Sequence, residues 1–239
     1  MRKLRPTASV IPNLFTAMNM FCGFLSIINA SQGKYLYASW LIIVAAIFDA
    51  LDGMVARLTN SSSALGVELD SLSDLISFGA APAFLVYSTY LFQFNAWGII
   101  VSSLLLIAGG FRLARFNVQL IGFDKAFFKG LPIPSSALTV STFILTFYEK
   151  GIGYPSPQDK FIIPMVLILS FLMVSRIKYD TFPKLTLSGI KEKPYIFIIL
   201  FLCLIAVIAT SGKALFYIFV LFILFGIFRH IFYWISRKS

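Results

Sequence analysis

Long runs of apolar residues constrain the fold of this chain more than any other feature of its sequence. A helix needs roughly 20 apolar residues to cross the hydrocarbon core of a bilayer. The sequence contains several such runs, separated by short polar connections. We predict eight spans, approximately at 14–31, 35–58, 70–91, 97–117, 132–150, 160–176, 195–211 and 214–234. The predicted fold class is therefore an all-α, polytopic transmembrane helix bundle.

The composition agrees with a membrane protein and excludes several other classes. Only 13% of the 239 residues are charged, against about 25% in soluble domains. The net charge of +10 lies in the connections between apolar runs rather than on one soluble face, which argues against a nucleic-acid partner. Cys22 and Cys203 lie inside apolar runs, so we expect neither a disulfide nor a cysteine metal site. The lone histidine, His230, is expected at the membrane interface, and any metal site must use oxygen ligands.

The distribution of lysine and arginine predicts the orientation. With the N-terminus in the cytoplasm, sixteen of the twenty basic residues face the cytoplasm and four, Lys34, Lys150, Lys160 and Lys213, face outside. This positive-inside bias places both termini and the connections after the second and fourth spans in the cytoplasm. We expect the basic N-terminal residues to form an interfacial lead into the first span rather than a cleaved signal peptide.

The acidic residues are concentrated around one of these cytoplasmic connections. Five of the ten carboxylates lie within 26 consecutive residues, at the end of the second span and the start of the third: Asp49, Asp52, Glu68, Asp70 and Asp74. Carboxylates at membrane depth are costly and are usually functional. We therefore expect the chemistry here, with Glu68 solvated.

The spacing of four of these acids predicts a metal site. Asp49 and Asp52 share one face of the second span with Gly53 and Ala56, and Asp70 and Asp74 are one turn apart on the third. Oxygen ligands without histidine or cysteine indicate a hard cation such as Mg²⁺ or Mn²⁺. Two such cations would cancel the repulsion between four neighbouring carboxylates. The structural alternative is that the acids pair with Arg57 and cap two helices.

The segment resembles the CDP-alcohol phosphotransferase family, whose signature is D-x2-D-G-x2-A-R-x8-G-x3-D-x3-D. Each fixed position of that signature is occupied, by Asp49, Asp52, Gly53, Ala56, Arg57, Gly66, Asp70 and Asp74. The resemblance implies that the four aspartates hold two divalent metals, which bind the pyrophosphate of a CDP-linked donor. It also implies that Asp74 is the general base that deprotonates the acceptor alcohol, and that CMP leaves.

Other residues near the acids are candidates for binding the donor, CDP-diacylglycerol. Gly53 and Ala56 carry little side-chain bulk, so a phosphate could approach the helix closely, and Arg57 and Gly66 complete the motif. Asn13 and Thr16 face the same cytoplasmic surface, where they could line the donor site or cap a helix. Ser73 and Ser77, on the face of Asp70 and Asp74, could contact substrate or satisfy backbone groups.

Three further segments, 77–83, 110–117 and 130–134, resemble the membrane-embedded phosphatidylserine synthase branch of the family. That resemblance implies transfer of a phosphatidyl group to L-serine in phospholipid biosynthesis, and a homodimer. Arg112 and Arg115, near the cytoplasmic end of the fourth span, suit a serine carboxylate. They could instead be anchors beside anionic lipid headgroups. Asn117 and Lys129 are further candidates for the acceptor site.

The sequence predicts two structural units and leaves two rival functions open. Residues 1–180 would form the catalytic bundle of about six spans, and residues 181–239 would add two more. The nearer rival is the same chemistry with glycerol 3-phosphate or inositol phosphate as acceptor. The more distant rival is a divalent-cation transporter, which should place its acids near the midplane on broken helices with access from both sides.

Overall fold

The computed structural model describes residues 10–59, 63–121, 130–177, 179, 209–210 and 212–236. Within these residues the chain forms helices and connecting turns, with a single isolated β-bridge between Glu149 and Gly153. The predicted all-α class is therefore confirmed.

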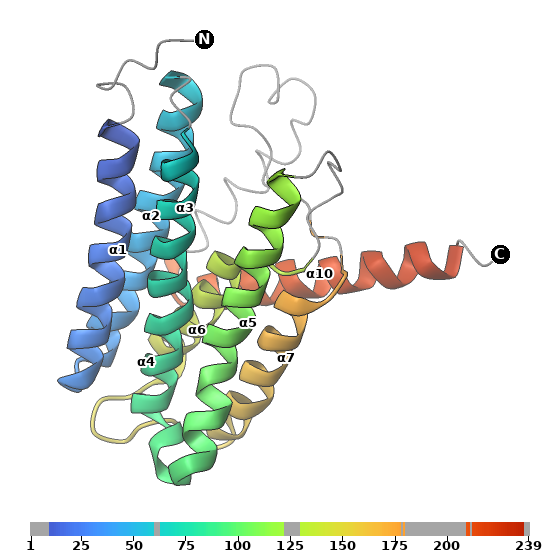
Figure 1. The fold of residues 1–239 in the computed structure, drawn as a ribbon. Coiled ribbons are helices and arrows are strands. Elements are labelled where there is room, and N and C mark those ends of the chain that lie inside the picture. The colour runs from blue at the N-terminus through green and yellow to red at the C-terminus, as the bar shows by residue number, and fades with distance from the viewer. Residues whose placement is uncertain are drawn as a thin grey trace, which may run out of the picture.

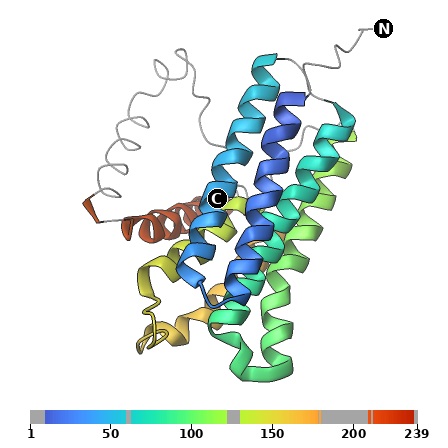
Figure 2. The same ribbon diagram turned by 90° about the vertical axis from the view of Figure 1, so that its left-hand side faces the viewer.

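The N-terminal half is a helical hairpin followed by a long composite helix. Helices α1 (Val10–Ser31) and α2 (Tyr35–Thr59) are joined by a tight turn in which Gly33 takes a positive φ of 75°. The composite helix consists of α3 (Ala64–Asp74), the π-helical segment η1 (Leu75–Ala80) and α4 (Ala81–Thr89). Figure 2 shows α1 in front, between α2 and the composite helix.

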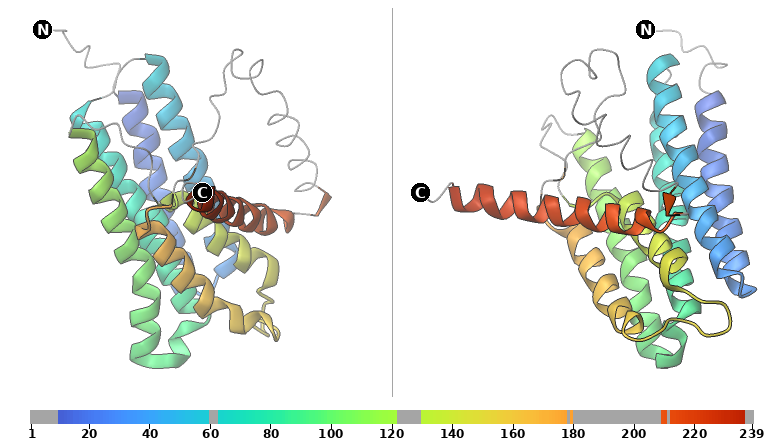
Figure 3. Two further views of the ribbon diagram at one scale, coloured as in Figure 1. Left: turned by 90° about the vertical axis from the view of Figure 1, so that its right-hand side faces the viewer. Right: turned by 180° about the vertical axis from the view of Figure 1, so that it is seen from behind.

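The remaining described helices complete the bundle and add one helix across it. A 3₁₀ turn, η2 (Leu91–Phe94), leads into α5 (Asn95–Ile121), which is followed by α6 (Ile133–Phe147). A second 3₁₀ turn, η3 (Gln158–Phe161), begins α7 (Ile162–Val174). The last helix, α10 (Ala214–Ser236), lies across the axes of the others and projects to one side (Figures 1 and 3).

The core lies where α6 packs against α2, the composite helix and α7. Ile42, Phe78, Leu85, Ile133 and Val140 are all essentially inaccessible to solvent. An aromatic cluster closes one end of the bundle, where the ring of Tyr148 lies within 5.2–5.3 Å of the rings of Tyr35 and Tyr154. Tyrosines of this kind are typical of a membrane–water interface.

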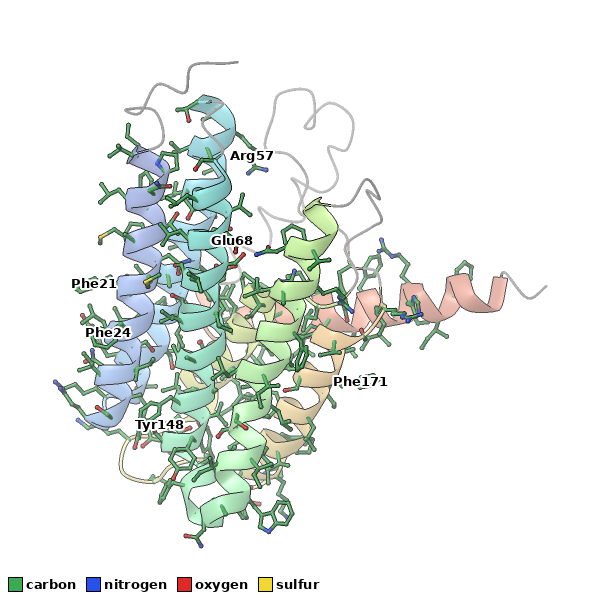
Figure 4. The ribbon with its side chains drawn as sticks, in the orientation of Figure 1. Phe21, Phe24, Arg57, Glu68, Tyr148 and Phe171 are labelled. Atoms are coloured by element: carbon green, nitrogen blue, oxygen red, sulfur yellow. The ribbon has the colours of Figure 1, made fainter. Side chains whose placement is uncertain are left out.

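Large apolar side chains cover the outside of the bundle. Phe21 and Phe24 on α1 and Phe171 on α7 point away from the neighbouring helices (Figure 4), and Phe171 is 71% exposed. Water would penalise so much exposed apolar surface, whereas lipid would not. Four helical stretches among the described residues are long and apolar enough to cross a membrane: Val10–Ser31, Leu65–Thr89, Leu91–Val118 and Ala214–Phe232. The chain is an integral membrane protein.

The helices agree with most of the predicted spans, with three qualifications. The third helix begins at Ala64, not near Asp70, because Ser63 caps it by accepting a hydrogen bond from the Gly66 amide (3.0 Å). The predicted seventh span, 195–211, lies almost entirely outside the described residues. The eighth forms the expected helix, but α10 is not aligned with the bundle (Figure 1). The total of eight spans stays a prediction.

Candidate active site and metal centre

Three acids from two helices meet near one end of the bundle. Asp49 on α2 and Asp70 and Asp74 on α3 each offer a carboxylate oxygen within 4.8 Å of the others. We call these three residues the acidic triad. Asp74 is 8% exposed, and Asp49 and Asp70 are half-buried. The short connection between α2 and α3 brings the two acidic helix ends side by side, as the sequence spacing predicts.

The fourth predicted acid, Asp52, has a different environment. It is buried, and its Oδ2 accepts a hydrogen bond of 2.9 Å from the Thr16 hydroxyl on α1. Its charge still interacts with those of Asp49 and Asp70. The structure therefore brings the four acids into one electrostatic cluster, but it groups three of them tightly and ties the fourth to α1.

Helix α1 contacts the acids through side chains and is itself held by serines. The Asn19 amide donates to Asp74 Oδ1 (3.3 Å). Ser73 donates to the carbonyl of Thr16 (3.0 Å), and Ser77 donates to the carbonyl of Asn19 (2.8 Å). Of the two roles open to these serines in the sequence, the structure shows them bonding to backbone groups.

The donor-site candidates lie around the connection between α2 and α3. Asn13 is close to Gly66: a Cβ at Gly66 would lie 3.5 Å from Asn13 Oδ1. Gly53 is open, with only the end of the Arg57 side chain within 4 Å of a Cβ placed there. The Arg57 Nε donates to the Gly53 carbonyl one turn earlier (2.8 Å), and Arg57 and Glu68 both lie toward this end of the bundle (Figure 4). Ala56 is half-buried on the same helix.

The acidic triad suits a divalent cation. Its ligand atoms are all carboxylate oxygens, which Mg²⁺ and Mn²⁺ prefer. In addition, Asp70 Oδ1 is buried and has no hydrogen-bond partner among the described residues. A buried, unpartnered carboxylate oxygen beside two other acids is costly unless a cation neutralises it.

The two candidate arginines for the acceptor differ in their contacts. Arg112 on α5 is 8% exposed, its charge interacts with that of Asp74, and its Nε lacks a hydrogen-bond partner within the described part of the chain. Arg115 instead reaches the C-terminal end of α7, where it donates to the Val174 carbonyl (3.0 Å). It also lies 3.5 Å from the carbonyls of Met173 and Ser175. Arg112 is therefore a buried cation within electrostatic range of Asp74, whereas Arg115 links two helices.

For the other two acceptor candidates, the structure shows no contact with the acidic triad among the described residues. Asn117 joins α5 to α3, because its amide donates to Ser71 Oγ (3.0 Å) and to Glu68 Oε2 (3.4 Å). Lys129 lies outside the described residues.

Comparison with known sequences identifies the family. A sequence profile described as CDP-alcohol phosphatidyltransferase matches residues 9–175, which include the acidic triad and Arg112. This chain belongs to that family. The match covers α1 to α7 and ends before α10.

Three of its curated relatives have serine in their names. A CDP-diacylglycerol–serine O-phosphatidyltransferase of Helicobacter pylori is 38% identical over 87% of this chain and 86% of its own length. An archaetidylserine synthase of Methanothermobacter thermautotrophicus is 42% identical over 71% of this chain and 69% of its own. A serine O-phosphatidyltransferase of Bacillus subtilis is 33% identical over 73% of this chain and 92% of its own.

Sequence reasoning missed two features of this family member. Asn19 was not a candidate, because one asparagine in an apolar run has no visible partner in the sequence. The π-helical segment η1 begins directly after Asp74, and its end is marked by the Ala81 amide bonding to the Ile76 carbonyl five residues earlier. Such segments occur often at functional sites. Here it directs Ser77 and its neighbours toward α1.

Proposed function

We propose that this protein transfers a phosphatidyl group from CDP-diacylglycerol to the hydroxyl of L-serine, giving phosphatidylserine and CMP. The observation that carries the proposal is the acidic triad, set within a family match whose close members are named for serine. No described feature favours glycerol 3-phosphate or inositol phosphate, whose additional phosphate would need further cationic groups near the acids.

Asp74 is the proposed general base. Two observations support this role: Asp74 belongs to the acidic triad, and its charge interacts with that of Arg112, the proposed partner of the acceptor. Asp74 would take the proton of the serine hydroxyl while that oxygen attacks the lipid-side phosphorus. The bond between this phosphorus and the CMP oxygen breaks, and CMP leaves with that electron pair.

The four aspartates Asp49, Asp52, Asp70 and Asp74 would hold two divalent cations, Mg²⁺ or Mn²⁺. When bound, such ions neutralise the charge on the pyrophosphate and on the departing CMP. Because these acids are side chains of α2 and α3, the two helices would fix the positions of the metal ligands. Thr16 contributes by holding Asp52 in a single orientation.

The donor and the acceptor would approach from different sides of Asp74. Gly53, Ala56, Arg57 and Gly66, with Asn13 and Thr16, form the proposed donor site, where the absence of bulk at Gly53 leaves room for phosphate. Arg112 is the proposed partner of the serine carboxylate, since a planar guanidinium binds a carboxylate through two parallel hydrogen bonds. The other proposed residues of the acceptor site are Arg115, Asn117 and Lys129.

The location of the reaction follows from the charge distribution. The positive-inside bias supports a cytoplasmic active site, where CMP and serine exchange with water while the acyl chains stay in the lipid. The homodimer is proposed from the family resemblance alone, and the mass of the purified protein in detergent tests it.

One experiment tests the reaction directly. Purified protein is given CDP-diacylglycerol with L-serine, glycerol 3-phosphate or inositol phosphate in turn, and CMP release is measured with and without EDTA. We expect release with L-serine, loss of release in EDTA and recovery on adding Mg²⁺ or Mn²⁺. Faster release with another acceptor would end the serine assignment, and activity that survives EDTA would end the metal mechanism.

A further inference from the structure

Asn19 on α1 is a buried amide with one side-chain partner. The residue has no exposed surface, and its Nδ2 donates to Asp74 Oδ1 (3.3 Å). Its Oδ1 is buried and has no hydrogen-bond partner in the part of the chain that the structure describes. An unpartnered buried carbonyl costs folding free energy. A side chain selected for packing alone would be served better by an apolar residue of similar shape.

The backbone at Asn19 is fixed from the opposite helix. Ser77 donates to the Asn19 carbonyl (2.8 Å), and Ser73 does the same one turn earlier at Thr16 (3.0 Å). Gly23 permits this approach because it has no side chain: a Cβ at this position would lie only 2.6 Å from Ser77 Cα and would clash with it. The backbone that carries the Asn19 amide is therefore held against the helix that carries Asp74.

We propose that Asn19 is a positioning residue, whose amide holds one oxygen of Asp74 and so directs the other toward the acceptor hydroxyl and the metal side. The inference rests on the role of Asp74 in the proposed function. It assigns to α1 a part in the chemistry that the acidic motif on α2 and α3 does not contain.

The test separates activity from stability. Asn19→Leu keeps the branched shape of the side chain with somewhat larger methyl groups, removes the donor to Asp74 and also removes the unpartnered carbonyl. We expect kcat for serine-dependent CMP release to fall about tenfold or more, the scale for losing a hydrogen bond to a charged group. The KM values for serine and donor should change by less than about threefold. The melting temperature should change little, because loss of the unpartnered carbonyl offsets the cost of fitting the larger methyl groups.

The matched control is Asn29→Leu on the same helix, where the amide donates to the Leu25 carbonyl (2.8 Å) away from the acids. This control should leave kcat unchanged. If Asn19→Leu does not fold, Asn19→Ala removes the same amide without adding apolar bulk and carries the same expectation for kcat and KM.

The outcomes are distinguishable. Unchanged kcat in a folded Asn19 variant, or a fall in kcat that only parallels a lower melting temperature, overturns the positioning role and leaves the proposed function intact. Wild-type protein that releases no CMP with serine would instead overturn the proposed function itself.

Discussion

The four acids of the motif are not equivalent at the scale of single residues. Asp49, Asp70 and Asp74 lie within 4.8 Å of one another, whereas Asp52 is tied to Thr16. Asp74 is the most buried of the triad and has both a donor, Asn19, and a nearby cation, Arg112. These features distinguish Asp74 from the other acids of the motif and support its proposed role as the general base.

Replacing Asp74 should separate proton transfer from binding. Asp74→Asn keeps the shape and one carbonyl oxygen but removes nearly all basicity. The turnover rate should fall by about 10² or more, the usual scale for losing a general base, while affinity for CDP-diacylglycerol falls only modestly. Steady-state CMP release and a donor-binding titration provide the two measurements. The control is Glu68→Gln, an exposed acid on the same helix, which should keep its activity. Turnover near the wild-type rate in Asp74→Asn would exclude Asp74 as the base.

The two arginines of α5 should respond differently to the same substitution. Arg112→Lys keeps the charge but loses the planar fork, so the apparent KM for serine should rise about tenfold with the donor KM nearly unchanged. Arg115→Lys should instead lower the melting temperature, because it loses contacts with the α7 carbonyls worth about 1–3 kcal/mol. Kinetics and thermal unfolding of both variants give the comparison. An elevated serine KM in Arg115→Lys alone would reverse the two roles.

At the scale of helices, close contact between α1 and the composite helix of α3 and η1 keeps these residues together. Ser73 and Ser77 donate to consecutive turns of α1, at the residues whose side chains contact Asp52 and Asp74. The acids are therefore positioned by three helices rather than by the two that carry the motif.

Gly23 is the position at which this contact is most sensitive. In Gly23→Ala the new Cβ would lie 2.6 Å from the backbone Cα of Ser77, so α1 and η1 must separate. Overpacking of this kind costs about 1–3 kcal/mol. We expect a lower melting temperature and a lower kcat, because Thr16 and Asn19 move away from the acids. Gly110→Ala is the control: its Cβ would lie 3.6 Å from Leu75 Cδ1, an ordinary contact. A Gly23 variant as stable and active as Gly110→Ala would contradict the close approach.

The sequence predicts helices and acids better than it predicts their mutual arrangement. Apolar runs set the extent of α1, α2 and α5, and the motif spacing predicts that acids of the second and third helices meet. The early start of α3 depends on the Ser63 cap, a local hydrogen bond that hydropathy does not register. The π-helical segment and the partner of Asn19 depend on contacts between helices. The direction of α10 also does not follow from its apolar composition, since a sufficient apolar length does not fix the angle of a helix.

At the scale of the whole molecule, the acidic triad lies toward one end of the bundle. The end of α2 and the start of α3 lie at one end, and the connection from α6 to η3 lies at the other (Figure 1). The acids lie nearer the first end, together with Arg57 and Arg112. Lys150 and Lys160 flank the second. On the predicted topology, sixteen of the twenty lysine and arginine residues lie on the side that carries the acids, and four lie on the other.

This bias in lysine and arginine predicts which end of the bundle faces the cytoplasm. Single cysteines at Thr59 and at Ile152, both exposed, would be made in a Cys22→Ala, Cys203→Ala background. A membrane-impermeant maleimide should label Ile152→Cys in right-side-out vesicles and Thr59→Cys only in inverted ones, because the positive-inside rule orients the acidic end inward. Both variants should react equally in detergent, which controls for access. Labelling of Thr59→Cys from the outside would reverse the orientation, and it would place the acids on the side where cytoplasmic serine cannot reach them.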